Sequence, residues 1–153
     1  MNIEDKLEEL GINLNDIPKP LGSYKPGVIS GNLLFISGQL PLSEGKLLFE
    51  GKVEADISLD QAMLATRQCA VNSLSIIKGE LGDLNKVKRI VKVTGYVASS
   101  QGFYKQANVV NGASDLYYEV FGEKGVHARA AVGVYELPLN SPVEVEVIVE
   151  IKS

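Results

Sequence analysis

The chain has 153 residues, of which 45% are hydrophobic, and a formal net charge of −4 at pH 7. This length and composition predict a single domain, residues 1–153, with a sizeable core. The acidic balance argues against nonspecific nucleic-acid binding, which depends on clustered basic residues. The N-terminus lacks the basic start of a signal peptide, and no run approaches the length of a membrane span, so we expect a cytoplasmic protein with no membrane partner.

One cysteine and one histidine limit the chemistry that the chain can perform. Cys69 lies in a helical apolar stripe, so we expect it in the core and without a disulfide. His127 has no second histidine with which to bind zinc or to build a nucleophilic triad. Any catalysis is therefore expected to use arginine, glutamate, tyrosine, backbone groups and water.

The first part of the chain predicts a short helix, an irregular arm and a hairpin. The helix covers residues 2–10 and ends at Gly11, and the arm completes the first 20 residues, ahead of a body over 21–153. Two short strands at 27–30 and 33–37 are separated by a Gly-Asn turn dipeptide. The second strand is apolar on both faces, so we expect it to be covered on both sides.

The rest of the chain predicts helices and strands in alternation. Ser58 and Gln61 have the spacing of a capping box and predict a long helix that ends near Gly82. A strand over 87–99 follows, and then a helix over 103–121 that we expect to be interrupted at Asn111 and Gly112. Two strands complete the chain.

This order of elements predicts an α+β fold, a sandwich in which one mixed sheet carries both main helices on one face. The chain offers no third layer to cover the other face of the sheet. We therefore expect subunits to pack sheet to sheet in a closed homo-oligomer.

Arg129 begins a strand that is otherwise suited to burial, and a buried guanidinium needs an anion. Ala131 and Gly133 share its face, and such small side chains leave space for a ligand above the sheet. A short connection leads to the last strand, so antiparallel pairing is expected to bring Glu144 near Arg129.

Two interpretations of this pair are open. Arg129 and Glu144 could form a structural salt bridge between neighbouring strands. Alternatively, Arg129 could donate a bidentate pair of hydrogen bonds to a substrate carboxylate, while Glu144 orients water or moves a proton. The alternation of the strands permits both.

Four blocks of the chain together resemble the reactive intermediate deaminase family, also called the Rid or YjgF family and long labelled endoribonuclease L-PSP-like. The blocks are Gly22-Ser-Tyr-Lys-Pro-Gly-Val28, Gly31-Asn-Leu-Leu-Phe-Ile-Ser-Gly-Gln-Leu-Pro41, Leu81-Gly-Asp-Leu-Asn-Lys-Val87 and Ala128-Arg-Ala-Ala-Val-Gly-Val134 with its continuation through Leu137-Pro138 to Glu146. They occur in the order of the family.

The resemblance implies a chorismate-mutase-like fold that trimerises through the open face of the sheet, with ligand clefts between the subunits. It also implies hydrolysis of small 2-enamine and 2-imino acids to 2-keto acids and ammonia, without a metal or cofactor. The carboxylate-binding arginine of the family falls on Arg129, and its water-orienting glutamate falls on Glu144.

By the same resemblance, further substrate contacts fall on Tyr24, Ser37, Gly38, Asn111 and Ala128. Tyr24 could instead be a packed loop aromatic, and Asn111 a helix irregularity beside a glycine. His127 shares the face of Arg129, so it is a candidate donor to the substrate or a pH-sensitive lid residue. The alternative is an exposed loop histidine.

The chain departs from the family pattern at several positions. Ser23 and His127 stand where the family often has proline, and Ala131 stands where it often has cysteine. The extra residues at the N-terminus and around 111–118 indicate a longer subgroup of about 150 residues. A noncatalytic trimeric binder of carboxylic metabolites is therefore a second hypothesis. A ribonuclease or translation inhibitor is a third, which the acidic charge and the single histidine disfavour.

Overall fold

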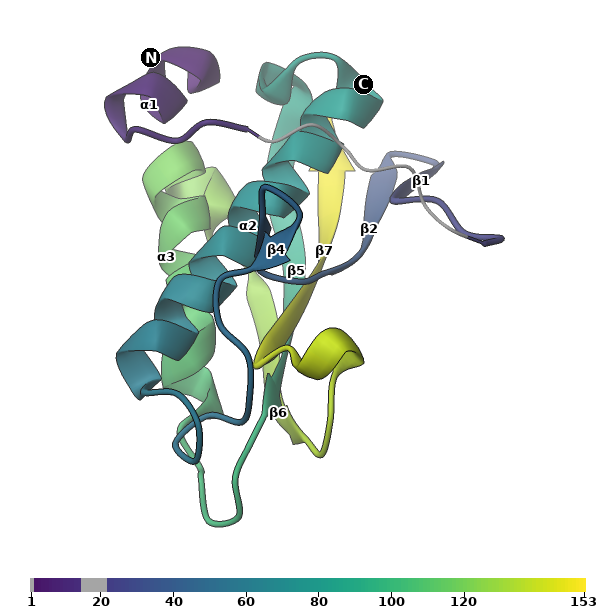
Figure 1. The fold of residues 1–153 in the computed structure, drawn as a ribbon. Coiled ribbons are helices and arrows are strands. Elements are labelled where there is room, and N and C mark those ends of the chain that lie inside the picture. Colours follow the sequence, from purple (N-terminus) through teal and green to yellow (C-terminus); the bar gives the residue numbers. More distant parts are fainter. Residues whose placement is uncertain (1, 15–21) are drawn as a thin grey trace.

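A computed structural model describes residues 2–14 and 22–153 (Figure 1). Most of the predicted arm thus lies outside the described residues. The helices are α1 (Ile3–Glu9), α2 (Leu59–Leu81) and α3 (Gln106–Phe121), with short 3-10 turns η1 (Leu84–Lys86), η2 (Gly122–Gly125) and η3 (Pro138–Asn140). The strands are β1 (Gly27–Ser30), β2 (Leu33–Gln39), β3 (Leu42–Ser43), β4 (Lys46–Leu47), β5 (Val87–Ala98), β6 (Ala128–Val134) and β7 (Val143–Ile151).

The main sheet has the strand order β1-β2-β7-β5-β6. β5 and β6 are parallel, and the other neighbouring strands are antiparallel. Both long helices, α2 and α3, cover the same face of this sheet (Figure 1). The predicted α+β class, with one mixed sheet and two main helices on one face, is confirmed.

The predicted pairing of the last two strands is wrong. β6 pairs with β5 through the register Val93 to Arg129, and β7 lies on the other side of β5, where Val97 faces Val143. The helix α3 provides the long crossover that a parallel pair requires, so β6 is added beside β5 and forms an edge of the sheet. The last strand then enters between β2 and β5.

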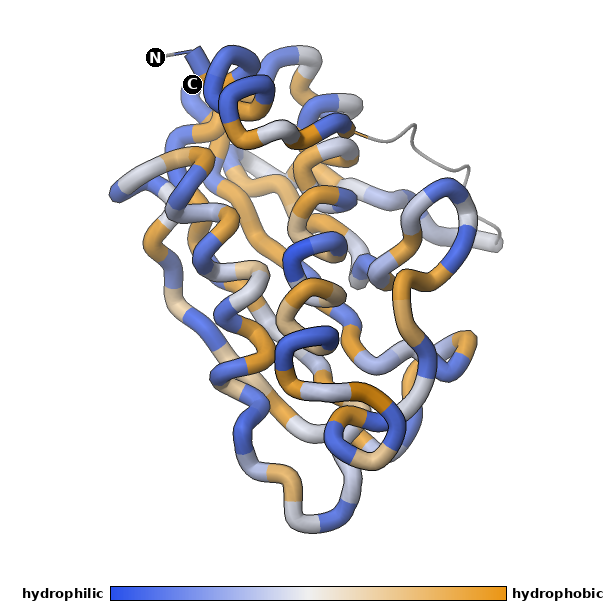
Figure 2. The backbone as a smooth tube through the Cα atoms, turned by 60° about the vertical axis from the view of Figure 1, so that its left-hand side comes forward, coloured by the Kyte–Doolittle hydropathy of each residue, from blue (hydrophilic) through white to orange (hydrophobic). Residues whose placement is uncertain are grey.

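The predicted hairpin of β1 and β2 is confirmed, with Ser30 opposite Leu33. Leu34 and Ile36 of β2 are buried beneath the helices, but Phe35 on the opposite face is 42% exposed. The expectation that this strand is covered on both sides is therefore not met within one chain. Hydrophobic residues follow the strands and one side of each long helix (Figure 2), so the core lies between the helices and the sheet.

The start of α2 is a reciprocal capping box, as predicted. The Ser58 hydroxyl accepts a hydrogen bond from the backbone of Gln61, and the Gln61 side chain accepts one from the backbone of Ser58. The helix ends at Gly82, whose φ of 79° is left-handed. Cys69 lies in the core as predicted, and burial raises the pKa of its thiol well above the ordinary value, which keeps the thiol protonated.

Helix α3 is continuous through Asn111 and Gly112, so the predicted interruption is wrong. Gly112 serves the crossing of the two long helices. A Cβ at this position would lie 2.0 Å from the carbonyl oxygen of Met63 on α2. Glycine is therefore required here for close approach of two backbones.

Replacing Gly112 with alanine is expected to lower the free energy of unfolding by about 2 kcal/mol, because the neighbouring atom is backbone and cannot turn aside. Helix propensity alone would predict a gain of about 1 kcal/mol. Urea unfolding at fixed protein concentration distinguishes the two signs. Asn108→Ala, at an exposed position of the same helix, is the control and should change stability little. A Gly112→Ala variant as stable as the wild type would contradict this account of the crossing.

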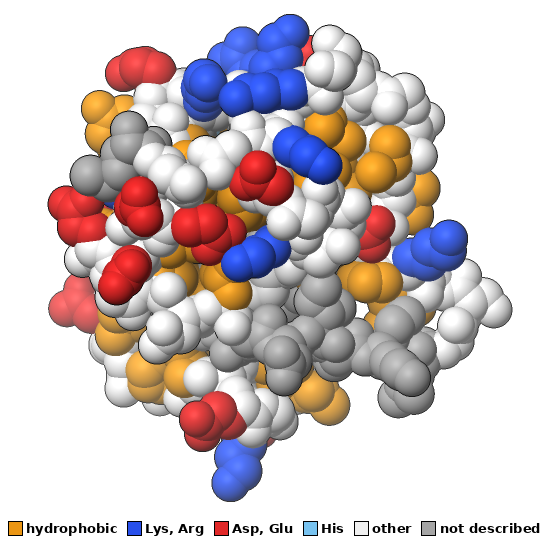
Figure 3. All heavy atoms as spheres, turned by 90° about the horizontal axis from the view of Figure 1, so that it is seen from above, with side chains coloured by type: hydrophobic (Ala, Val, Ile, Leu, Met, Phe, Trp, Pro, Cys, Tyr) orange, Lys and Arg blue, Asp and Glu red, His pale blue; other side chains and the backbone are white. Residues whose placement is uncertain are grey.

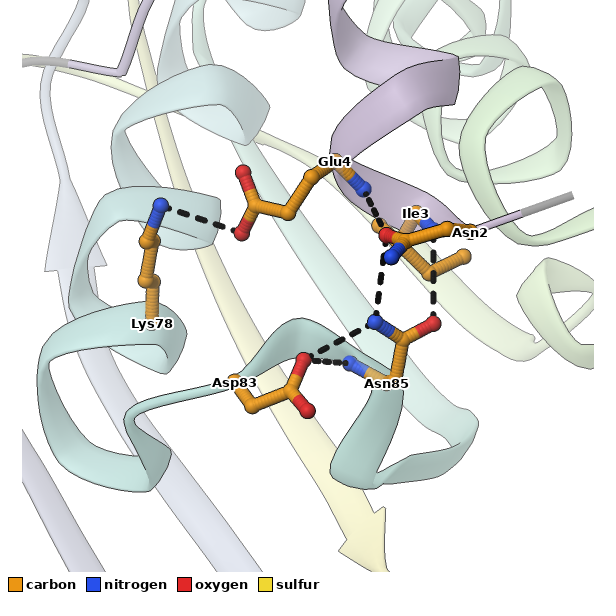
Figure 4. A network of polar contacts seen from close by, with 6 residues as sticks. All are labelled: Asn2, Ile3, Glu4, Lys78, Asp83 and Asn85. Carbon is orange, nitrogen blue, oxygen red and sulfur yellow. Dashed lines mark hydrogen bonds and ion pairs between the residues drawn. The ribbon is translucent and has the colours of Figure 1, made fainter.

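The N-terminal helix α1 is fixed to the body by a polar network (Figure 4). The Asn2 side chain caps α1 and accepts a hydrogen bond from Asn85 of η1 at 3.3 Å. Asp83 in turn accepts bonds from the backbone and side chain of Asn85. Glu4 forms an ion pair with Lys78 of α2 at 3.0 Å.

Seen from above, this end of the molecule carries separate groups of acidic and basic side chains, so neither positive nor negative charge covers it alone (Figure 3).

Candidate functional site

Arg129 points toward the helix layer, because it is in register with the buried Val93 of β5. Its Nη1 donates hydrogen bonds to Asn111 Oδ1 at 2.7 Å and to Ser114 Oγ at 3.1 Å. Both acceptors lie on α3. Residues three apart share one face of a helix, so a single stretch of α3 presents both oxygens to the guanidinium.

The Arg129 guanidinium has no carboxylate partner among residues 2–14 and 22–153. The side chain is nevertheless only partly exposed. It borders a hollow of about 360 Å³, lined by Asn111, Ser114, Tyr118, Gly125, Val126, His127 and Arg129. A half-buried cation that meets no protein anion beside an open hollow is suited to an anionic ligand.

His127 belongs to the same cluster and is not an exposed loop histidine. Its Nδ1 lies 2.6 Å from the carbonyl oxygen of Gly125, and its Nε2 lies 2.9 Å from Ser114 Oγ. Since a carbonyl oxygen can only accept, Nδ1 carries the proton and Nε2 accepts the hydrogen bond from Ser114. Burial is the main cause that lowers the pKa of His127, and the nearby Arg129 cation lowers it as well.

The expected space above Ala131 and Gly133 is filled by protein. A Cβ at Gly133 would lie 2.9 Å from Gln106 Nε2 and 3.1 Å from Ser99 Oγ. The absence of a side chain at Gly133 thus allows Gln106 of α3 and Ser99, which follows β5, to approach β6 closely. The hollow lies instead at the start of β6, beside η2.

Glu144 lies on the opposite, open face of the sheet. It is in register with Tyr96, and the residues on either side of it, Val143 and Val145, are buried against the helices. A Cβ at Gly38 would lie 2.2 Å from Glu144 Oε2, so the carboxylate passes directly over this glycine. Burial raises the pKa of Glu144, and Glu146 raises it further.

Ser37 holds the segment that follows Tyr24 against the end of β2. The Ser37 hydroxyl donates to the carbonyl of Lys25 at 2.6 Å, and the Ser37 amide donates to the carbonyl of Pro26 at 2.8 Å. Tyr24 itself is 58% exposed, so it is not a packed loop aromatic. The structure therefore brings Tyr24, Ser37, Gly38 and Glu144 to one region.

The candidate residues thus form two separate groups. Arg129, Asn111 and His127 make the first, and the Glu144 group makes the second. Ala128 joins neither through its side chain, which points to the open face beside Lys92, away from Arg129.

The expected proximity of Arg129 and Glu144 is wrong within one chain. The strand β5 separates them, and their register partners on it, Val93 and Tyr96, are three residues apart. Standard strand dimensions place the two Cα atoms about 14 Å apart, with side chains on opposite faces. The salt bridge between these two residues is excluded for the same reason.

Ser114 is the member of the cluster that the sequence interpretation missed. The available signal was its spacing from Asn111, since a helix that presents one polar side chain to an arginine also presents the residue three positions on.

Among the described residues, no three His, Cys, Asp or Glu side chains come together in a way that could hold a metal ion. No helix in the same part of the chain is both long and apolar enough to cross a membrane.

The mixed sheet and the two helices on one face define an α+β protein, and Arg129 lies at one edge of its sheet beside α3 without a carboxylate partner among the described residues. A family model described as "YjgF/chorismate_mutase-like, putative endoribonuclease" matches residues 4–151. The chain therefore belongs to this family. The resemblance to the Rid/YjgF family and the chorismate-mutase-like fold are thereby confirmed.

The similar proteins match the chain over nearly its full length. Protein TCP17 of Trypanosoma cruzi is 43% identical over 148 residues, which cover 96% of this chain and 92% of TCP17. A protein of unknown function from Agrobacterium tumefaciens has a crystal structure that overlaps with a TM-score of 0.90 at 47% identity, covering 99% of this chain and 92% of its own. RidA from an Antarctic Psychrobacter overlaps with a TM-score of 0.63 at 27% identity, covering 92% and 98%.

Proposed function

We propose that this protein hydrolyses small, reactive 2-imino and 2-enamine acids to 2-keto acids and ammonia. Arg129 binds the carboxylate of the substrate, and Glu144 orients the attacking water. The scheme uses no metal or cofactor. Its main support is the Arg129 guanidinium. This group is hydrogen-bonded to α3 and lies beside the hollow, yet it meets no protein carboxylate among the described residues.

The chemistry follows from the two groups of residues. An imino acid carries a carboxylate next to an electrophilic C=N carbon. Water adds to this carbon, and Glu144 accepts a proton from the water and returns a proton to the nitrogen. In the resulting carbinolamine, the hydroxyl proton moves through Glu144 to the nitrogen while the C=O bond forms and the C–N bond breaks, which releases ammonia and leaves the keto acid. Fixing the carboxylate and the water together can supply several kcal/mol of barrier lowering.

The two groups face opposite sides of one sheet, so one chain alone does not assemble this site. We therefore propose a homotrimer in which Arg129 of one copy faces Glu144 of its neighbour across a cleft. The open face of the sheet supports this arrangement, because it exposes Val28, Phe35 and Val132 by 41% or more. Apolar patches of this kind mark interfaces between proteins.

The decisive experiment generates free imine in the presence of the protein. A purified amino-acid dehydratase or oxidase supplies 2-iminobutyrate or 2-aminoacrylate at neutral pH, and the disappearance of the imine is followed directly. Addition of this protein is expected to accelerate hydrolysis above the spontaneous rate. No acceleration over a range of protein concentrations would reject the enzymatic proposal.

A second candidate function is a noncatalytic trimeric sensor of small carboxylic metabolites. The same observation supports it, because Arg129 could retain a keto acid without any chemistry. Under this alternative, a keto acid binds in an Arg129-dependent manner while imine hydrolysis stays at the spontaneous rate. A ribonuclease or translation inhibitor receives less support, since the net charge is −4 and the chain has one histidine.

A further inference from the structure

We propose that Ser114 and His127 are positioning residues of the Arg129 site, which hold the guanidinium in one orientation through a directed chain of hydrogen bonds. This inference rests on the proposed function, because it assumes that Arg129 receives the carboxylate. Neither residue needs to touch the ligand. They act by fixing the group that does.

The direction of the hydrogen bonds in this series is determined by the last acceptor, the Gly125 carbonyl oxygen. The Gly125 carbonyl accepts from His127 Nδ1 at 2.6 Å, so His127 Nε2 is free to accept from Ser114 at 2.9 Å. The Ser114 oxygen then uses a lone pair to accept from Arg129 Nη1 at 3.1 Å. Every donor therefore points away from Arg129 and toward Gly125, and each atom has the partner that its chemistry allows.

The series of hydrogen bonds ends on a rigid piece of backbone at Gly125. Gly125 is buried, and a Cβ there would lie 2.1 Å from the carbonyl oxygen of Tyr117, so η2 is packed directly on α3. The His127 ring also meets the Tyr117 ring edge-on, with centroids 5.9 Å apart. Both contacts restrict the ring that orients Ser114. The lowered pKa of His127 favours the neutral form that this chain requires.

These hydrogen bonds determine which edge of the Arg129 guanidinium is offered to a ligand. The two hydrogens of Arg129 Nη1 are used by Asn111 and Ser114. A guanidinium has five N–H donors, so the donors on Nη2 and Nε remain. In the described part of the chain no acceptor is bonded to them. A carboxylate can take a bidentate pair from this edge, which stays correctly oriented only while Nη1 is held.

The first test measures the affinity for 2-oxobutyrate by calorimetry. Ser114→Ala and His127→Ala are each expected to bind about tenfold more weakly than the wild type, as expected for loss of one hydrogen bond to a charged group. The double variant should bind no more weakly than either single variant, because both substitutions break the same chain. Ser114→Thr and His127→Gln retain a donor and an acceptor and should restore most of the affinity.

The control is Ser58→Ala, which removes the cap of α2 and lies beside a different hollow from Arg129. It should reduce stability and leave the affinity unchanged. Wild-type affinity in both alanine variants, losses that multiply in the double variant, or a His127→Gln variant as weak as His127→Ala would overturn the inference.

A second readout does not depend on a ligand. The Nη nitrogens of a guanidinium held through Nη1 give separate NMR signals, because rotation about its C–N bonds is hindered. These signals of Arg129 should be separate in the wild type and His127→Gln, and should exchange more rapidly in Ser114→Ala and His127→Ala, which lose the fixed Ser114 acceptor but keep the bond to Asn111 Oδ1. Averaged signals in the wild type would overturn the positioning role. Separate signals without any binding of 2-oxobutyrate would instead count against the proposed function.

Discussion

Replacing Arg129 with alanine is expected to weaken 2-keto acid binding and lower kcat/KM for imine hydrolysis by about 30-fold or more. Truncation of one partner of a buried, hydrogen-bonded charge pair costs about 2–5 kcal/mol, which corresponds to this factor. Arg129→Lys should recover only part of the loss, because lysine keeps the charge but has no planar donor fork. Calorimetry with 2-oxobutyrate and the imine assay measure the two effects separately.

Arg67→Ala is the matched control for the loss of an arginine that contacts α3. Arg67 pairs with Glu119 at 3.1 Å on the helix surface, where an ion pair contributes little to stability. This variant should keep the affinity and the rate of the wild type. Thermal melting and the mass of the oligomer in solution establish that Arg129→Ala remains folded. An Arg129→Ala variant that is folded and hydrolyses imine at the wild-type rate would refute the carboxylate role.

Replacing Glu144 with glutamine is expected to lower kcat by about 10²- to 10⁴-fold, the usual contribution of a positioned proton acceptor. Binding of 2-oxobutyrate should change little, because the carboxylate is held by Arg129. The variant is nearly isosteric with the wild type and preserves the close contact over Gly38. Initial rates and calorimetry on the same preparation separate the two quantities. Loss of binding with an unchanged kcat would contradict the assignment.

The pH dependence of the rate provides a second check on Glu144. The wild-type rate should rise with pH as Glu144 loses its proton. Burial is the main cause that raises the pKa of Glu144 above the ordinary value of 4.5, and the negative charge of Glu146 raises it further. The acidic limb of the rate profile is therefore expected above that pH. Glu146→Gln removes a neighbouring negative charge, so it should lower the pKa of Glu144 and shift the limb to lower pH. The glutamine oxygen can still accept the hydrogen bond from Tyr96. A limb that does not move would exclude Glu144 as the titrating group.

Local signals in the sequence were reliable where the structure depends on neighbouring residues. The capping box at Ser58, the stop at Gly82 and the two-residue hairpin turn are all present as predicted. Each is decided by hydrogen bonds and backbone angles within a few positions. The buried Cys69 follows from the same kind of signal, the helical spacing of apolar residues.

Other features were misread because a local pattern has more than one tertiary explanation. Asn111 and Gly112 predicted a break, but the glycine serves a helix crossing and the asparagine binds Arg129. Likewise, Ala131 and Gly133 predicted room for a ligand, although small residues also allow a helix to approach the sheet. The sequence does not say which of these uses applies.

The sequence by itself determined the class of fold, the caps of α2 and the core stripe of α2, because each depends on residue type and short spacing. Only the tertiary structure decided that β5 lies between Arg129 and Glu144, and that Ser114 contacts both the Arg129 guanidinium and the His127 ring. The order of strands in a sheet depends on packing between segments distant in the chain. Alternation along one strand gives the face of a residue but not the strand beside it.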